Sequence, residues 1–296
     1  MKEKPFSKYQ ILANAVMIIW TLAIILPFIL LFMSSITDEN TLVANGYSFF
    51  PKKFSLASYS YIIKSGGQIL KAYGVSIGVT VVGTLLNVLL SALMVYPLSV
   101  KNLPGRNVMM FFVFFTMLFN GGIVPSYIMW TGTFHIKDTI FAQLLPNFLL
   151  SAWNVMMIRT YFTTSIPDGL YEAAEIDGAS QFTIFWKIVL PLGKPILVTM
   201  GTFAGLAYWN DWTNGLYYIV KNTGLYNVQN LLNQMVQNIQ FLTQSSNSNV
   251  TAAASTIPAT GIQMAIAFVA ILPIMLIFPS FQKYYAKGIA LGAVKG

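Results

Sequence analysis

The chain has 296 residues, of which 56% are hydrophobic and only 9% are charged. Soluble domains carry roughly 25% charged residues, so this composition excludes an ordinary soluble protein. The net charge of +8 fits membrane topology better than nucleic-acid binding. With no cysteine and a single histidine, His135, the chain offers no disulfide, no thiolate site and no histidine-based metal or catalytic centre. We therefore expect an all-α polytopic membrane protein without a bound metal or a nucleic-acid partner.

Six apolar stretches are long enough to cross a bilayer, which takes about 20 helical residues. The first follows Lys2, Lys4 and Lys8 and resembles the start of a signal peptide, but its apolar run is too long, so we expect a retained span. A cytoplasmic N-terminus (1–10) and a C-terminal tail (281–296) would flank the membrane domain (11–280). The predicted spans are 11–33, 73–97, 108–127, 139–158, 196–216 and 262–280.

Basic residues indicate the orientation of these spans. If the amino terminus lies inside, the inner segments hold eleven of the seventeen basic residues and the outer segments hold six. Because cytoplasmic loops of membrane proteins are enriched in Lys and Arg, we expect both termini in the cytoplasm.

The segment 221–261 is rich in Asn, Gln, Ser and Thr. Its first part, 228–242, has apolar residues at helical spacing and predicts an amphipathic helix, whereas 244–256 reads as a loose polar linker. The pairs Gly74/Gly78 and Gly201/Gly205 match the small-xxx-small pattern of close helix packing.

Four of the nine acidic residues fall between Asp168 and Asp177, between the fourth and fifth predicted spans. Asp168 suits the positive end of a helix, and Gly178 allows a sharp turn. A short polar helix here predicts either a solvated connection or a docking surface for a soluble partner. No G-x-x-x-x-G-K-[ST] loop occurs in the chain, so a partner would have to bind any ATP that drives it.

The cluster Trp209, Asn210, Asp211 and Trp212 ends the fifth predicted span. Aromatic residues concentrate at membrane interfaces, but flat rings beside amide and carboxylate groups also suit a sugar. Polar residues within spans could line a pathway or form hydrogen bonds between helices; they are Asn87, Gln143, Asn147 and Asn154.

Several segments together resemble a known family. The acidic stretch resembles the EAA motif of importer permeases of the ATP-binding-cassette (ABC) class. The cluster at 209–212 and the tail at 288–296 are similar to sugar permeases related to the maltose permease subunit MalG, and 120–127 is similar to the G-G-x-x-P-x-Y feature of the LplC/YtcP subgroup, which is associated with complex oligosaccharides. The EAA match consists of Glu172-Ala173-Ala174, three residues, Gly178, nine residues, and Ile188-Val189-Leu190-Pro191.

This resemblance implies a type I ABC importer permease of the bacterial cytoplasmic membrane, with six membrane helices and an EAA loop at about 163–194. The chain itself would be neither an enzyme nor a cofactor-binding protein. Its implied partners are a second, homologous permease subunit, two ATPase subunits that hold ATP and Mg²⁺, an extracytoplasmic solute-binding protein and membrane lipid. The residues implied in ATPase coupling are Glu172, Ala173, Ala174, Asp177, Gly178, Leu190, Pro191 and Lys295.

The resemblance implies a carbohydrate, and specifically an oligosaccharide, as the transported solute. A substrate pathway could involve Trp209, Asn210, Asp211, Trp212 and Asn154. Two alternatives stay open: an ABC importer permease for a non-sugar solute, and a secondary transporter driven by an ion gradient. The second is disfavoured because the predicted spans carry no carboxylate or lysine suited to a proton relay.

Overall fold

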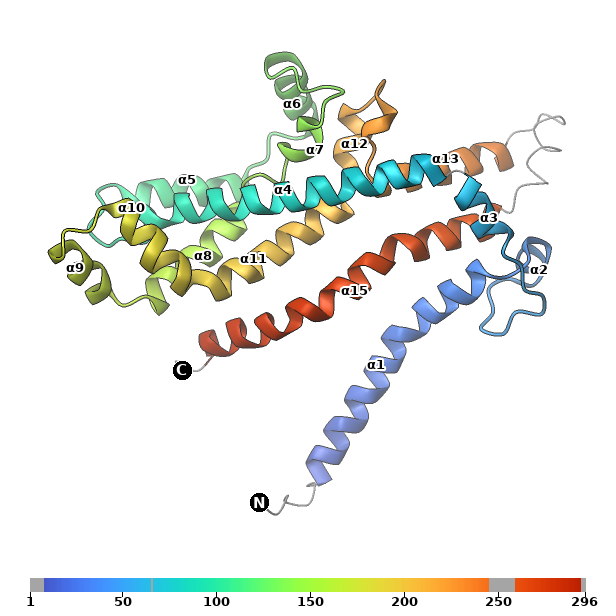
Figure 1. Cartoon of the computed structure of the whole chain (residues 1–296), viewed down its shortest axis with the longest axis horizontal. Helices are drawn as coiled ribbons and strands as arrows, with labels where there is room; N and C mark the ends of the chain where they lie inside the picture. Colours follow the sequence, from blue (N-terminus) through green and yellow to red (C-terminus); the bar gives the residue numbers. More distant parts are fainter. Residues whose placement is uncertain (1–7, 65, 245–258, 294–296) are drawn as a thin grey trace. The chain divides into compact units, whose positions relative to one another are not determined.

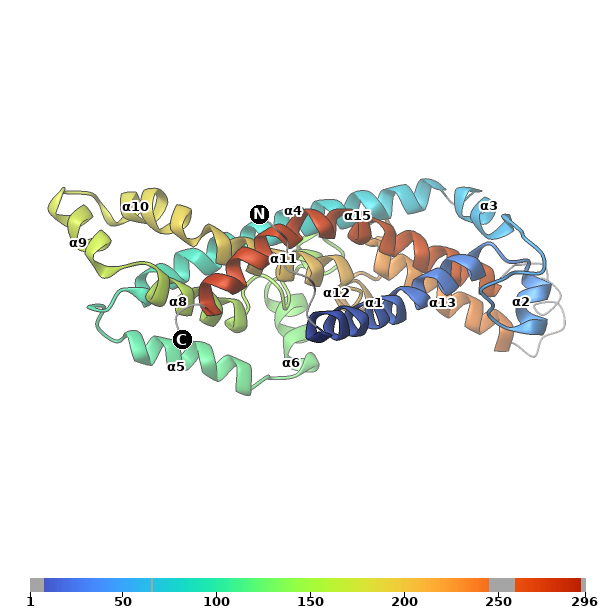
Figure 2. The same cartoon turned by 90° about the horizontal axis from the view of Figure 1, so that it is seen from below.

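The computed structural model describes residues 8–64, 66–244 and 259–293. Helices dominate, and in these ranges the extended pairing is limited to an isolated bridge between Thr37 and Phe54. The predicted all-α class is confirmed. The chain forms two compact units, residues 1–69 with 232–274 and residues 70–231 with 275–296, which are described separately below (Figures 1 and 2).

The first unit contains α1 (Lys8–Ser35), α2 (Glu39–Asn45) and α3 (Ala57–Lys64). It also includes the second part of α13 (Val228–Gln244) and the first part of α15 (Ala259–Ala293). Its core joins α3 to α15 through four buried side chains. These are Ile62, Ile262, Ala265 and Ile266.

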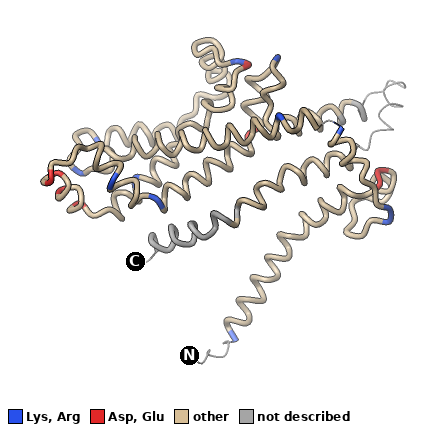
Figure 3. The backbone as a smooth tube through the Cα atoms, in the orientation of Figure 1, with Lys and Arg blue, Asp and Glu red and all other residues tan. Residues whose placement is uncertain are grey.

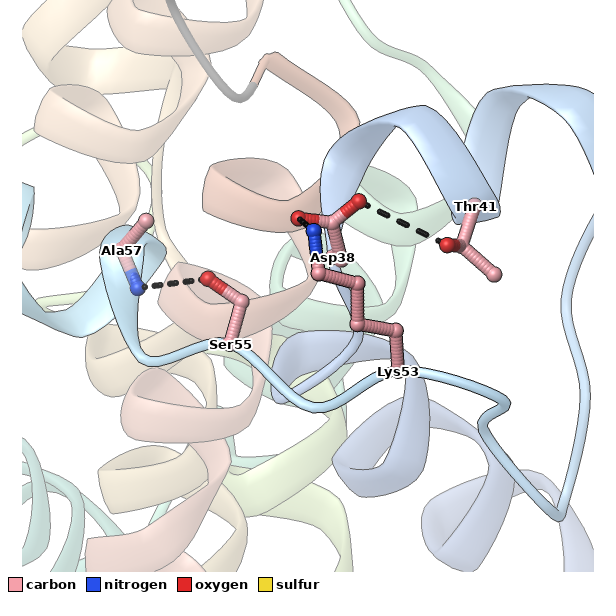
Figure 4. Close-up of polar contacts among 5 residues, drawn as sticks. All are labelled: Asp38, Thr41, Lys53, Ser55 and Ala57. Carbon is pink, nitrogen blue, oxygen red and sulfur yellow. Dashed lines mark hydrogen bonds and ion pairs between the residues drawn. The ribbon is translucent and has the colours of Figure 1, made fainter.

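The loop around α2 is held by a set of short-range polar contacts (Figure 4). Asp38 pairs with Lys53 at 3.3 Å and accepts a hydrogen bond from Thr41 at 3.5 Å. The neighbouring Glu39 accepts the backbone N–H groups of Thr260 and Gly261, both at 2.8 Å. A carboxylate at these N–H groups satisfies donors that the start of a helix leaves free, so Glu39 fixes the loop to the first turn of α15.

The second unit is built on three long helical segments. Helix α4 (Gly66–Ser99) packs with α8 (Ala152–Ser165) and α11 (Leu190–Asn210) around a core that includes Val95, Ile158 and Phe162. The shorter elements of this unit are α5 (Arg106–Leu118), α6 (Ile123–Ile128), the π-helix Met129–Thr133, α7 (Phe141–Leu144), α9 (Asp168–Ile176), α10 (Gln181–Ile184), the π-helix Phe185–Val189, α12 (Thr213–Tyr218) and the 3₁₀ turn Thr223–Leu225.

One of the two predicted glycine pairs is packed within the chain. A Cβ added at Gly201 would lie 3.1 Å from Val88, and one at Gly205 would lie 3.2 Å from Thr84 Oγ1, so α11 approaches α4 closely at these positions. Gly74 and Gly78 face open space instead. The helix-packing prediction is therefore confirmed for the pair on α11, whereas the pair on α4 has no packing partner in the described part of the chain.

The number of continuous spans differs from the six predicted. In the described residues, four helices are long and apolar enough to cross a membrane, namely Lys8–Ser35, Gly66–Ser99, Gln181–Asn210 and Thr260–Ile277. The third predicted span is a pair of helices, Arg106–Leu118 and Ile123–Thr133, that bends by 111°.

The fourth predicted span, 139–158, is interrupted. Helix α7 ends at Leu144 and α8 begins at Ala152. Between them Pro146 cannot donate a backbone hydrogen bond, and Asn147 has a φ of +68°, which ends the right-handed helix. The predicted amphipathic helix at 228–242 is confirmed as α13, while the predicted linker, apart from Gln244, lies outside the described residues.

Candidate functional site

The stretch with the EAA pattern forms a helical hairpin made of α9 and α10. Its turn follows Asp177, where Gly178 has a φ of +75° and the N–H of Ala179 bonds to the carbonyl of Ala174 at 2.9 Å. A left-handed glycine is a common way to end a helix because it carries no Cβ penalty. Ser180 then caps α10 by accepting the N–H of Thr183 at 3.2 Å. We call residues 168–184 the α9–α10 hairpin.

Two of the four acids in this hairpin are engaged within the chain. Asp168 pairs with Lys101, and Glu175 accepts a hydrogen bond from Gln181 at 2.8 Å. Glu172 and Asp177 are exposed, and among the described residues no ion pair or side-chain hydrogen bond engages them. Figure 3 shows acids at this end of the second unit, where basic residues also lie. The hairpin therefore presents two exposed carboxylates that have no partner in the described part of the chain.

Helix α9 has an inner face and an outer face. On the inner face, Ala174 is buried and the ring of Tyr171 stacks 6.4 Å from that of Tyr96; burial raises the pKa of Tyr171 to about 12. On the outer face, Ala173 is exposed and Ile176 is 86% exposed. The small side chain of Ala174 thus allows close packing inside this chain, whereas Ala173 is placed where a second protein could approach.

A π-helical turn, Phe185–Val189, joins the hairpin to α11. Pro191 follows it and has no N–H to give to the preceding turn, so a wider turn relieves the clash that a proline creates in a regular helix. Leu190 is half-buried against the core, and Pro191 is exposed. The remaining predicted coupling residue, Lys295, lies outside the described residues.

The predicted cluster at 209–212 does not converge on one point. Trp209 is buried, with its ring 6.3 Å from that of Tyr73, whereas Asn210 and Trp212 are exposed. Asp211 is buried, and its Oδ1 accepts the N–H groups of Thr213 and Asn214 at 3.0 and 3.2 Å. Its carboxylate therefore caps α12.

Asn154 and Asn87 hold the interrupted helix together. Asn154 donates to Asn87 Oδ1 at 3.0 Å, and Asn87 donates to the carbonyl of Phe148 at 2.7 Å. Both asparagines are buried. Together they supply a hydrogen bond to a backbone carbonyl of the non-helical segment between α7 and α8. In an apolar medium this carbonyl would otherwise have no hydrogen-bond partner.

A second set of amides, all buried except Asn147, was not recognised from the sequence as one network. It comprises Gln143, Asn147, Asn214, Asn227 and Asn230, and we call it the amide network. Single polar residues in apolar runs were visible in the sequence, but their partners lie about 70 to 90 positions away. The bonds include Gln143 Nε2 to Asn230 Oδ1 (3.2 Å), Asn227 Nδ2 to Gln143 Oε1 (3.3 Å), Asn147 Nδ2 to Asn214 Oδ1 (3.3 Å) and Asn214 Nδ2 to the Pro146 carbonyl (3.1 Å).

An open groove of about 560 Å³ runs along α4, and Lys71 is its one charged lining residue. The rest of its lining is apolar or glycine, including Gly74, Gly78 and Leu144. None of the residues at 209–212 lines it. The described residues also contain no group of three or more His, Cys, Asp or Glu side chains able to hold a metal ion.

The family of the chain follows from comparison with known proteins. Residues 72–291 match the model of the family described as "Binding-protein-dependent transport system inner membrane component". The chain belongs to this family. It is therefore a multi-pass membrane permease of the binding-protein-dependent transport class, and the family resemblance drawn from the EAA pattern is confirmed.

Relatives of this permease cover almost its whole length. It is 36% identical over 272 residues to Protein LplC of Bacillus subtilis (strain 168), covering 92% of this chain and 90% of that protein. It is 35% identical over 288 residues to the polygalacturonan/rhamnogalacturonan transport system permease protein YtcP of the same organism, covering 97% and 98%.

A solved structure supports the same fold. A chain from the crystal structure of a bacterial ABC transporter involved in the import of the acidic polysaccharide alginate superimposes with a TM-score of 0.78 at 25% sequence identity. The alignment covers 96% of this permease and 100% of that chain. The predicted ABC importer permease fold is confirmed.

Proposed function

We propose that this permease is the membrane subunit of an ATP-driven ABC importer that carries an oligosaccharide across the bacterial cytoplasmic membrane by alternating access. One observation carries the proposal: a member of this family folds the first part of its EAA pattern into a hairpin that leaves Glu172 and Asp177 exposed and unpaired among the described residues. Such a surface suits a basic cleft on a soluble partner.

That partner is a pair of ATPase subunits, which bind ATP and Mg²⁺, because this chain has no phosphate-binding loop. A second, homologous permease subunit completes the pathway, and an extracytoplasmic solute-binding protein delivers the solute. In this arrangement both termini lie in the cytoplasm, residues 11–280 form the membrane domain, and Lys295 in the tail at 281–296 contributes to the ATPase contact.

The hairpin can drive the pathway because it is continuous with two long helices. The chain runs from α8 into α9, and from α10 through the π-helical turn into α11. A displacement of the hairpin therefore moves the ends of α8 and α11. ATP binding can bias the outward and inward states only by its different affinity for each of them, so docking at Glu172, Ala173, Asp177 and Gly178 must differ between the two states.

The substrate class rests on the relatives. YtcP is named for polygalacturonan and rhamnogalacturonan, two other relatives for arabinooligosaccharides, and the structural neighbour for alginate. We infer an oligosaccharide substrate for this permease. Trp212 and Asn210 are the exposed members of the predicted substrate cluster and are better placed to meet a passing sugar than Trp209, Asp211 and Asn154, which are buried.

A matched pair of isosteric variants tests the docking surface. In the assembled transporter, we expect Glu172→Gln to lower the affinity of the ATPase subunits, whereas Glu175→Gln should not, because a glutamine oxygen can still accept the bond from Gln181. Co-purification and ATP-driven uptake in proteoliposomes measure both. Equal affinity of the two variants would contradict the proposed role of Glu172.

The substrate class is tested with the partner solute-binding protein, by thermal shift against oligogalacturonides, neutral oligosaccharides, amino acids and peptides. Stabilisation by an amino acid or peptide alone would overturn the oligosaccharide assignment. Vesicles that contain only this permease should not accumulate the solute. Accumulation there would instead support an ion-driven transporter.

A further inference from the structure

The end of α4 lies against the α9–α10 hairpin, although 85 positions separate the bonded residues in the sequence. Tyr96, on α4, is 9% exposed and donates its hydroxyl hydrogen to Gln181 Oε1. The ring of Tyr96 lies 6.4 Å from that of Tyr171 on α9 and 5.5 Å from that of Phe185 in the π-helical turn. One side chain of α4 therefore touches α9, α10 and the turn that leads into α11.

Gln181 is held from both sides. Its Oε1 accepts from Tyr96, and its Nε2 donates to Glu175 on α9 at 2.8 Å. The hydrogen bonds thus run from α4 through α10 to α9. Tyr96 is buried, whereas Gln181 and Glu175 are exposed, so these bonds run from the core of the unit to its surface.

A second contact joins the same two parts just beyond α4, where Lys101 pairs with Asp168 in the first turn of α9. Both side chains are more than half exposed, so the pair is worth little by itself. Tyr96 combines a hydrogen bond with two aromatic contacts, each favourable beyond the burial of its area. Tyr96 is therefore the main connection, and we call it, with Gln181 and Phe185, the α4 clamp.

We propose that the α4 clamp makes α4 move with the hairpin, so that ATPase closure displaces α4, α8 and α11 together. This inference rests on the proposed docking of the hairpin to an ATPase. Peptide continuity couples the hairpin to α8 and α11, and α4 packs on α11 farther from the hairpin, near Gly201 and Gly205. The clamp adds a direct contact between the hairpin and α4, whose remaining length forms one wall of the groove at Lys71, Gly74 and Gly78, and thereby gives ATP binding a further means to move that wall. Tyr96 is a positioning residue: it acts through the hairpin and not on the solute.

Spin labels test whether the helices move as one body. The native chain has no cysteine, so Leu85→Cys on α4 and Leu192→Cys on α11, both at exposed positions, give the one labelled pair on this chain when the partner subunits are prepared without cysteine. In the assembled transporter, we expect the label-to-label distance to show no resolvable shift between the nucleotide-free and ATP-bound states. Adding Tyr96→Leu should shift or split that distance in the ATP-bound state while the ATPase subunits stay bound.

Two further variants serve as controls. Tyr96→Phe keeps the ring contacts and loses the hydroxyl, so it should have a smaller effect than Tyr96→Leu. Tyr127→Leu removes a comparable tyrosine, which stacks on Tyr218 at 5.8 Å and accepts a bond from Lys137 at 3.0 Å, and should leave the distance unchanged. The proposal would be overturned if the label-to-label distance changed on ATP binding in the chain that keeps Tyr96. It would also be overturned if Tyr96→Leu left the distances in both nucleotide states unchanged.

A cross-link gives an independent test that leaves Tyr96 intact. Lys101→Cys and Asp168→Cys, bridged by a short bifunctional maleimide, would tie the segment just beyond α4 to α9. If they move together, binding-protein-stimulated ATP hydrolysis should persist after bridging. Loss of stimulation on bridging, but not in either single-cysteine variant, would show that the clamp must open. Failure of docking itself appears separately, as unchanged ATPase affinity in Glu172→Gln.

Discussion

Two regions of the second unit use polar residues in opposite ways. In the amide network, Gln143, Asn214, Asn227 and Asn230 are each at most 3% exposed and bond to one another and to carbonyls of irregular backbone. In the α9–α10 hairpin, Glu172, Asp177 and the apolar Ile176 face outward. Buried and satisfied polar groups hold a fold in place, whereas exposed carboxylates beside an exposed apolar side chain suit the docking to another protein that we propose.

The largest effect on folding should come from the amide network. Asn230→Leu removes the acceptor of Gln143 Nε2 and the donor to the Trp212 carbonyl. Each group left unpaired costs about 1–3 kcal/mol, so the variant should lose roughly 2–6 kcal/mol of stability. Thermal unfolding in detergent measures this loss, with Gln237→Leu, an exposed change on the same helix, as the control. A similar loss of stability in both variants would show that the amide network stabilises the fold no more than an exposed glutamine does.

The next largest effect on stability should come from replacing a tightly packed glycine of α4 with alanine. A Cβ at Gly83 would lie 2.5 Å from Cζ of Tyr208, while one at Gly78 meets nothing within 4 Å. Gly83→Ala should therefore cost about 1–3 kcal/mol by overpacking. Gly78→Ala should be neutral or gain up to about 1 kcal/mol of helix propensity. Thermal unfolding measures the stability of both variants. Equal stabilities would contradict the close packing of Gly83 against Tyr208.

At the hairpin, a substitution should affect assembly and spare the fold. Ile176→Ser changes a side chain that is 86% exposed, so stability should stay within about 0.5 kcal/mol. If Ile176 is an apolar anchor of the ATPase contact, affinity for the ATPase should fall about tenfold, or about 1.4 kcal/mol. Val43→Ser on α2, where Val43 is 70% exposed, is the matched control. An unchanged affinity would remove Ile176 from the docking surface.

A pH dependence of stability should come from the contacts of Asp138. Asp138 accepts the backbone N–H groups of Val220, Lys221 and Asn222 at 2.7, 2.7 and 3.2 Å, and the bond from Lys221 leads the contacts that lower its pKa. A lowered folded-state pKa means that the stabilisation is present above the unfolded value of about 4 and disappears as pH falls through the folded value. The stability difference between wild type and Asp138→Asn should therefore shrink on acidification from pH 7 to pH 3. A constant difference would contradict this assignment.

The smallest effect should come from the exposed ion pair. Lys101→Ala breaks the pair with Asp168, whose side chains are 66% and 53% exposed. Exposed pairs contribute about 0–1 kcal/mol, so unfolding should hardly change, in contrast to Tyr96→Leu in the α4 clamp. A loss from Lys101→Ala as large as that from Tyr96→Leu would show that the ion pair, and not Tyr96, carries the connection.

The sequence located the hairpin because its signals are local. The acidic residues from Asp168 to Asp177 and the glycine at 178 predict a short polar helix and a sharp turn without reference to distant residues, whereas the second helix, α10, was not predicted. These local signals did not reveal that Ala173 and Ala174 face opposite ways. That difference depends on Tyr96, which lies about 75 positions earlier and packs on the inner face of α9.

The interrupted fourth span was missed for a related reason. Residues 139–158 are apolar enough to read as one helix, and periodicity cannot separate a continuous helix from two short ones. Pro146 was a local warning. The stability of the break, however, comes from Asn87 and Asn214, whose bonds to this segment span 61 and 68 positions. Long-range hydrogen bonds of this kind leave no local pattern.

The carboxylate of Glu39 imposes an order on biosynthesis. Its partners, the N–H groups of Thr260 and Gly261, follow it by 221 and 222 positions, and translation adds about 5–20 residues each second. The loop after the first helix must therefore wait roughly 10–45 s for the last one to emerge. During that interval, α1 and α2 are in place without the helix that completes their unit, and a ribosome that stops before residue 260 leaves the loop without its anchor.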